Sequence, residues 1–297
     1  MPARLRIPMA SAAWLFLAMA TTFAIADEPT LREVTDIVYT KAGGVELKLD
    51  IVSPAKGEGP FPSVLVIHGG AWRAGNKSDT RQVMREFAGR GYVAVSPQYR
   101  FCPREVFPAQ LYDVKAAVRW MKQHAKEQKM DPDRIGAVGF SAGAHLALML
   151  GVTSPSDGLE GEAPAGSPDS RIRAVVNYFG PVDLAATDIP EVSKPLVRDF
   201  LGATPIERPD LAAMASPRTY LTRDDPPILT FQGTKDPLVP HTQAVELAEA
   251  MTAAGIPGRV ELLVGAGHGW GGDLVPHTAG EMFTFLDRHL KGTQKQP

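Results

Sequence analysis

The chain has 297 residues, of which 44% are apolar and 22% are charged, and its formal net charge at pH 7 is −2. A chain of this length and composition can bury a large core. The near-neutral balance of charges gives no reason to expect a nucleic-acid partner.

The first 26 residues have the pattern of a secretory signal peptide. Arg4 and Arg6 precede an apolar stretch over residues 9–20, and Ala24-Ile25-Ala26 has the small-x-small pattern of a signal peptidase site. The apolar stretch is shorter than the roughly 20 residues that a membrane-spanning helix needs. We therefore expect a secreted or periplasmic protein whose mature chain begins near Asp27 and keeps no stable membrane anchor.

Short apolar runs alternate with helical patterns along the rest of the chain. Residues 45–52 alternate in polarity like an exposed antiparallel strand, whereas 64–67 and 93–95 are continuous apolar runs typical of buried parallel strands. Further strands are expected at 135–138, 174–178, 227–231 and 260–264, and helices at 81–88, 111–121, 144–150, 243–254 and 280–290. This alternation predicts a single α/β domain over residues 27–297, with a mostly parallel, twisted sheet and helices on both faces.

Two stretches interrupt this alternation. Residues 153–170 are rich in Gly, Pro, Ser and acidic side chains, which predicts a mobile surface loop. Residues 184–225 form a long connection between two strands, with scattered prolines and short helical pieces. Because long connections in compact domains are usually functional or disordered, we expect this segment to form a cap or wall over a site.

Ser141 is a candidate nucleophile. It lies in Gly139-Phe140-Ser141-Ala142-Gly143, between an apolar run and a helical segment. This matches the Gly-x-Ser-x-Gly pattern, in which a sharp strand-to-helix turn exposes the serine oxygen. The flanking glycines remove Cβ atoms that would clash in so tight a turn. The alternative is that Ser141 only caps a helix.

A second glycine motif directly follows the expected strand at 64–67. In His68-Gly69-Gly70-Ala71-Trp72, two glycines at the carboxyl end of a strand allow backbone amides to face a substrate carbonyl, as an oxyanion hole requires. With a serine nucleophile, the expected donors are the N–H groups of Gly69 and Gly70 together with that of Ala142. The alternative is a glycine turn on which Trp72 packs.

Asp236 and His268 follow Ser141 in the chain order that a strand-helix hydrolase requires. Asp236 comes just after the strand expected at 227–231, and His268 just after the one at 260–264. The three residues should therefore meet at one sheet edge. Ser141 would attack an acyl carbon, His268 would take and return the proton, and Asp236 would orient the imidazole.

No cofactor or metal is expected. The histidine spacings supply no cluster of metal ligands, and Cys102 has the context of a small buried residue rather than a nucleophile. Gly267, Gly269 and Gly272 match the dinucleotide-binding pattern by spacing, but too few residues follow them for the helix, strand and acid that give the pattern its meaning.

Together, the motifs 68–72, 139–143, 236–240 and 267–269 resemble those of the α/β-hydrolase superfamily, and within it the secreted carboxylesterases of the hormone-sensitive-lipase-like and acetyl-xylan/feruloyl esterase groups. The likeness runs from about Asp36 to Leu290. It implies that Ser141, Asp236 and His268 are a catalytic triad. Lipases of this group often have a third glycine where this chain has Ala71, and the His-Gly-Gly-x-Trp form is also similar to that of kynurenine formamidases.

These observations favour a secreted serine esterase for short acyl groups, with acetyl groups on polysaccharides or sugars as candidate substrates. The alternatives are a formamidase-like amidase, a peptidase of the prolyl-oligopeptidase type, and a non-catalytic binding protein. Trp72, Tyr99 and Trp270 are candidate substrate contacts, since aromatic rings stack on sugar or phenolic rings, but each could equally belong to the core. The sequence gives no oligomeric state.

Overall fold

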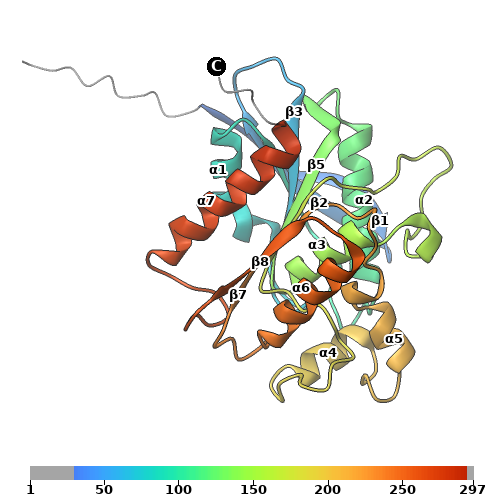
Figure 1. Cartoon of the computed structure of the whole chain (residues 1–297). Coiled ribbons are helices and arrows are strands. Elements are labelled where there is room, and N and C mark those ends of the chain that lie inside the picture. The colour runs from blue at the N-terminus through green and yellow to red at the C-terminus, as the bar shows by residue number, and fades with distance from the viewer. Residues whose placement is uncertain (1–29, 293–297) are drawn as a thin grey trace, which may run out of the picture.

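The computed structural model describes residues 30–292, and the strands within this range form one mixed sheet (Figure 1). The predicted signal peptide lies outside the described residues. Within residues 30–292, no helix combines the length and the apolar character needed to cross a bilayer.

Eight strands form the sheet in the order β1-β2-β4-β3-β5-β6-β7-β8. The first two strands pair antiparallel with each other, β2 pairs antiparallel with β4, and all remaining pairs are parallel. The strands are β1 (Leu31–Ala42), β2 (Val45–Pro54), β3 (Phe61–Ile67), β4 (Val93–Pro97), β5 (Met130–Phe140), β6 (Val175–Tyr178), β7 (Ile228–Gly233) and β8 (Gly258–Leu263).

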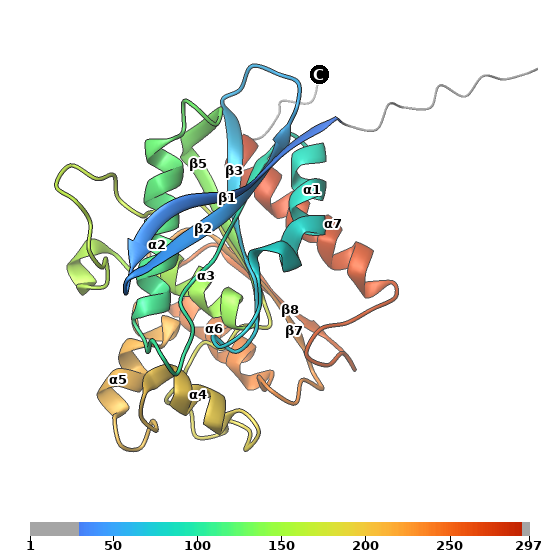
Figure 2. The ribbon, with the colours of Figure 1, turned by 180° about the vertical axis from the view of Figure 1, so that it is seen from behind.

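Helices cover both faces of the sheet. The helices are α1 (Arg81–Gly89), α2 (Ala109–Gln123), α3 (Ala142–Val152), α4 (Lys194–Leu201), α5 (Pro209–Met214), α6 (Thr242–Ala254) and α7 (Leu274–Leu286), with short helical turns at Lys77–Thr80, Pro155–Asp157, Pro217–Thr219 and Asp287–Lys291. Side chains of α1 and α7 share one apolar cluster with the sheet, and those of α2, α3 and α6 share another (Figures 1 and 2). The predicted fold class, a mostly parallel sheet with helices on both faces, is confirmed.

The structure differs from the sequence prediction at both ends of the sheet. The prediction missed β1, whose pairing with β2 shifts register between Val34 and Ile37 and again between Val38 and Thr40. Such irregularities break the period-two pattern on which strand prediction depends. The prediction also took β2 as exposed, whereas most of its residues are buried because its side chains pack into the apolar clusters on both faces of the sheet.

The segment 153–170, predicted to be a mobile loop, is anchored to α2. The carboxylate of Glu160 pairs with the ammonium of Lys115, which is fully buried, and with the guanidinium of Arg119. It also accepts a hydrogen bond from the Ser170 hydroxyl at 2.8 Å. The composition of this loop predicted its surface position but gave no sign of these partners.

The parallel strands determine where the site forms. Because β3, β5, β6, β7 and β8 run in the same direction, the loops that follow them all leave from one edge of the sheet. These loops carry Gly69, Gly70, Ser141, Asp236 and His268. Helices α4 and α5 lie beyond the same edge (Figure 2).

Candidate active site

Ser141 occupies a strained turn between β5 and α3. Its φ of 53° lies in a region that non-glycine residues seldom adopt, and its N–H donates a hydrogen bond to the Tyr178 carbonyl at 2.8 Å. The glycines on either side allow this turn. A Cβ added to Gly139 would lie 2.2 Å from the carbonyl oxygen of Gly143, and a Cβ added to Gly143 would lie 2.3 Å from the carbonyl oxygen of Ile67. The serine is therefore held by a backbone geometry that only these glycines permit.

Ser141, His268 and Asp236 form a hydrogen-bonded line across three loops. The Oγ of Ser141 lies 2.8 Å from Nε2 of His268, and Nδ1 of His268 lies 2.8 Å from Oδ2 of Asp236. A carboxylate only accepts hydrogen bonds, so the imidazole proton is on Nδ1 and Nε2 is free to accept the serine proton. The structure thus brings together the three residues that the sequence singled out.

The carboxylate of Asp236 is buried and accepts several hydrogen bonds besides the one from His268. Its Oδ1 accepts the N–H groups of Leu238 at 2.8 Å and Val239 at 2.9 Å, and Oδ2 also accepts from Nε2 of Gln232 at 3.0 Å. Burial opposes ionisation, but the hydrogen bonds from His268 and from the two amides outweigh it and lower the pKa of Asp236. The group therefore stays ionised beside the imidazole.

Phe179 fixes the other side of the histidine ring, and sequence reasoning missed it. It follows β6, has a φ of 47°, and its ring packs edge-on against His268 with 4.7 Å between ring centroids. Its place after a parallel strand, at the same sheet edge as Ser141, was the signal in the sequence that could have identified it.

The loop after β3, residues 68–75, runs close to the nucleophile. An added Cβ on Gly69 would lie 2.9 Å from the Phe140 oxygen, and one on Gly70, whose φ is 114°, would lie 2.1 Å from the Ala74 oxygen. Gly69, Gly70 and Ala142 all line the same cavity as Ser141. Ala142 is the first residue of helix α3, so its N–H group has no hydrogen-bond partner within the helix.

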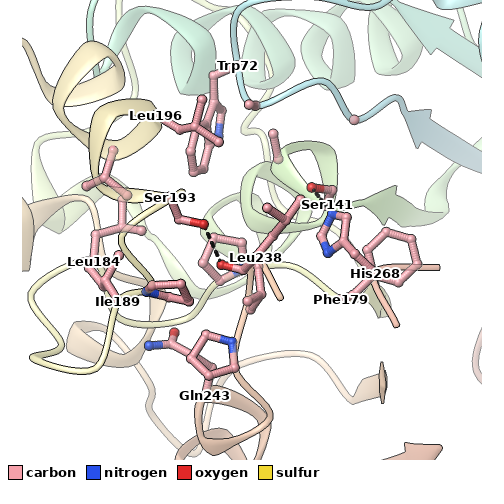
Figure 3. A pocket seen from close by; sticks show the side chains of 18 of the residues that line it. Trp72, Ser141, Phe179, Leu184, Ile189, Ser193, Leu196, Leu238, Gln243 and His268 are labelled. Carbon is pink, nitrogen blue, oxygen red and sulfur yellow. Dashed lines mark hydrogen bonds between the residues drawn. The ribbon is translucent and has the colours of Figure 1, made fainter. Parts of the chain in front are cut away.

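A cavity of about 400 Å³ opens beside Ser141 and His268 (Figure 3). Most of its lining is apolar. The polar side chains in the wall form hydrogen bonds with other protein groups. Asp183 accepts from Arg218 at 2.8 Å, and Ser193 donates to the Leu238 carbonyl at 2.7 Å. Gln243 accepts from the N–H of Val182 at 2.8 Å. The apolar walls are formed by Trp72, Phe140, Phe179, Pro181, Leu184, Ile189, Pro190, Leu196, Val197, Leu238, Val239 and Pro240.

The segment 184–225 contributes five of these apolar residues, from Leu184 to Val197, together with Ser193, and it carries α4 and α5. It thus forms part of the cavity wall beside the catalytic candidates.

Of the three aromatic residues predicted as substrate contacts, only Trp72 lines the cavity. Tyr99 is buried behind the loop 68–75, where its ring stacks on His68 and its hydroxyl donates to the His68 carbonyl at 3.0 Å. Trp270 packs against Phe179 and donates its indole N–H to Thr278 Oγ1 at 3.1 Å. Neither ring lines the cavity, because each packs against and hydrogen-bonds to other residues of the protein. Both rings therefore support the site from outside the cavity.

The strand order, and the serine, histidine and aspartate on loops at one sheet edge, define an α/β-hydrolase. The BD-FAE family matches residues 49–251, more than half of the chain, so the chain belongs to the BD-FAE family. The resemblance to α/β-hydrolase esterases noted in the sequence is confirmed.

Several known proteins similar to this chain are esterases. The Esterase LipC of Mycobacterium tuberculosis is 32% identical over 219 residues, which cover 71% of this chain and 53% of LipC. The chain spans about half the length of the curated relatives it matches. Among solved structures, a thermophilic esterase of Thermogutta terrifontis, Est2 with propionate bound, is 27% identical with a TM-score of 0.73, covering 91% of this chain and 97% of Est2. A truncated carbohydrate esterase from gut microbiota is 26% identical with a TM-score of 0.76, covering 90% of this chain and 98% of its own.

Proposed function

We propose that this protein is a serine esterase that hydrolyses short-chain acyl esters through an acyl-enzyme. The observation that carries the proposal is the unbroken line of hydrogen bonds from Asp236 through His268 to Ser141, at 2.8 Å each, beside a cavity with free space for an acyl group. The esterases among its relatives and structural neighbours support the same reaction.

The mechanism follows from the positions of these groups. Ser141 Oγ attacks the acyl carbon while His268 Nε2 takes its proton, and the amides of Gly69, Gly70 and Ala142 stabilise the negative charge that develops on the carbonyl oxygen. The imidazolium then gives its proton to the leaving alcohol, which leaves an ester on Ser141. His268 then takes a proton from a water molecule as the water attacks this ester. The imidazolium returns that proton to Ser141 Oγ as the bond between the serine oxygen and the acyl carbon breaks, which releases the acid.

The finer proposal is that the alcohol part of the substrate is a sugar or polysaccharide and that the acyl part is an acetyl or other short group. The likeness to a carbohydrate esterase supports a sugar ester, and the propionate bound to Est2 supports a short acyl group. Since the polar side chains of the wall are engaged with the protein, the cavity suits the apolar acyl chain, and the sugar would remain at its mouth. The predicted signal peptide favours a secreted or periplasmic location.

Hydrolysis of nitrophenyl esters from acetate to decanoate, together with acetylated xylan and N-formylkynurenine, tests this proposal. We expect acetate to butyrate to be cleaved fastest, acetate to be released from xylan, and Ser141→Ala to abolish all turnover. A preference for N-formylkynurenine would assign the protein as a formamidase, the class of enzyme whose motif His68-Gly69-Gly70-Ala71-Trp72 also resembles. Turnover that persists in Ser141→Ala would refute the mechanism.

A further inference from the structure

The loop 68–75 contains two successive non-glycine residues in a left-handed conformation. The φ angles of Ala71 and Trp72 are 51° and 56°, immediately after the two glycines that face the cavity. Each such residue costs on the order of 1 kcal/mol or more, and such strain persists only where the surroundings hold it. Contacts of the Trp72 side chain therefore matter for the position of Gly69 and Gly70.

The indole N–H of Trp72 donates a hydrogen bond to Nδ1 of His145 at 3.3 Å. The other ring nitrogen of His145, Nε2, lies 2.7 Å from the carbonyl oxygen of Ala215. An indole nitrogen can only donate and a carbonyl oxygen can only accept, so the imidazole carries its proton on Nε2. His145 is fully buried, and both of its ring nitrogens are satisfied in this one neutral tautomer.

His145 connects three parts of the site. It lies on α3, one turn after Ser141, and its backbone N–H donates to the Ser141 carbonyl at 3.0 Å. Ala215 follows α5 in the segment 184–225, and Trp72 belongs to the loop 68–75. The indole ring of Trp72 also stacks on Phe200 of α4, with 4.2 Å between ring centroids.

We propose that His145 is a positioning residue that, through the indole N–H of Trp72, fixes the Gly69 and Gly70 amides relative to Ser141. The proposal rests on the esterase function proposed above. Loss of the contact frees a strained loop to relax, which displaces donors whose hydrogen bonds strengthen in the transition state. The effect should therefore fall on kcat more than on KM.

Replacing Trp72 by phenylalanine tests the link, because it removes the indole N–H and keeps an aromatic ring against Phe200. We expect kcat for nitrophenyl acetate to fall about tenfold, with KM changed less than about twofold. Trp120→Phe is the matched control. Trp120 is a buried tryptophan of α2 that stacks on His124 at 4.3 Å, and its indole N–H makes no hydrogen bond within residues 30–292. Equal kcat values for the two variants would overturn the proposal.

Two variants of His145 separate its two hydrogen bonds. His145→Asn keeps an acceptor near the position of Nδ1, and His145→Gln keeps a donor near the position of Nε2. If His145 acts through Trp72, the Asn variant keeps several-fold more of kcat than the Gln variant, and adding Trp72→Phe to His145→Gln lowers kcat little further. Equal kcat values for the Asn and Gln variants, or additive losses in the double variant, would contradict the proposal.

The design separates this proposal from the proposed function. Turnover that survives Ser141→Ala rejects the esterase mechanism itself. Turnover that requires Ser141 but is unaffected by Trp72→Phe rejects only the positioning role. If the His145 variants fail to fold, the comparison of Trp72→Phe with Trp120→Phe still decides the outcome.

Discussion

Nδ1 of His268 lies 2.8 Å from Oδ2 of Asp236, and this contact determines which imidazole nitrogen can act as a base. The carboxylate is itself held by two backbone amides and by Gln232, so it cannot turn away from the ring. The imidazole therefore presents an unprotonated Nε2 to Ser141. The direction of the whole hydrogen-bonded line depends on the charge of one buried carboxylate.

Asp236→Asn should lower kcat for nitrophenyl acetate by about 10⁴-fold, because an amide donor facing Nδ1 favours the tautomer with its proton on Nε2. Steady-state hydrolysis by the purified variant measures the loss, and circular dichroism checks that the fold is kept. Asp273→Asn is the control, since Asp273 is exposed, lies five residues after His268 and does not cap α7 with its side chain. A similar kcat in both variants would argue against Asp236 as the acid of the triad.

Gly70→Ala should reduce both stability and activity. The added Cβ would lie 2.1 Å from the Ala74 oxygen, and the φ of 114° strains any L side chain. We expect unfolding in urea to show a loss of about 1–3 kcal/mol and kcat to fall by at least about a hundredfold. Gly280→Ala provides the opposite control: this exposed helical glycine has open space around it, so alanine should stabilise the protein by up to about 1 kcal/mol.

The sequence was sufficient to predict the parallel part of the sheet, and that Ser141, Asp236 and His268 lie together, because both depend on local signals. Short apolar runs separated by helical patterns identify parallel strands, and such strands bring their following loops to one edge. Ser141, Asp236 and His268 each follow such a run. Ser141 and His268 are 127 positions apart in the chain, yet predicting that they meet required no knowledge of side-chain packing.

Residues whose role depends on packing could not be predicted in the same way. Tyr99 and Trp270 are aromatic residues near motifs, like Trp72, and only the tertiary structure shows that their rings are turned to His68 and Phe179. The early start of α7 was missed for a local reason. Pro276 interrupts the helical pattern, yet a proline is tolerated in the first turn, where its missing N–H has no partner to lose.

Leu196 of α4 lines the cavity and should set the length of the acyl group. Leu196→Trp would fill part of the space of about 400 Å³, so kcat/KM for nitrophenyl hexanoate should fall by about tenfold relative to that for acetate. Val192→Trp introduces the same side chain nearby, at an exposed position that does not line the cavity, and should leave the ratio unchanged. A ratio unaffected by Leu196→Trp would mean that the acyl chain lies elsewhere.

His145 should make the folded state sensitive to acid. Burial lowers the pKa of His145 from 6.5 to about 4, against the opposing effect of the Ala215 carbonyl, so the folded protein keeps the imidazole neutral where the unfolded chain would protonate it. Between these two pKa values the unfolded state binds more protons, and stability therefore rises with pH. The contribution is complete above pH 6.5 and is lost as the pH falls toward about 4.

The expected loss is on the order of 3 kcal/mol over that range, since each pKa unit corresponds to about 1.4 kcal/mol. Urea unfolding of the parent protein and of His145→Gln, each at about pH 7.5 and about pH 4.5, measures it. Other groups titrate equally in both proteins, so the parent should lose about 2–3 kcal/mol more than the Gln variant, which has no imidazole at this position. Equal losses would show that the folded protein protonates His145 as readily as the unfolded chain does, and would remove His145 as the source of acid sensitivity.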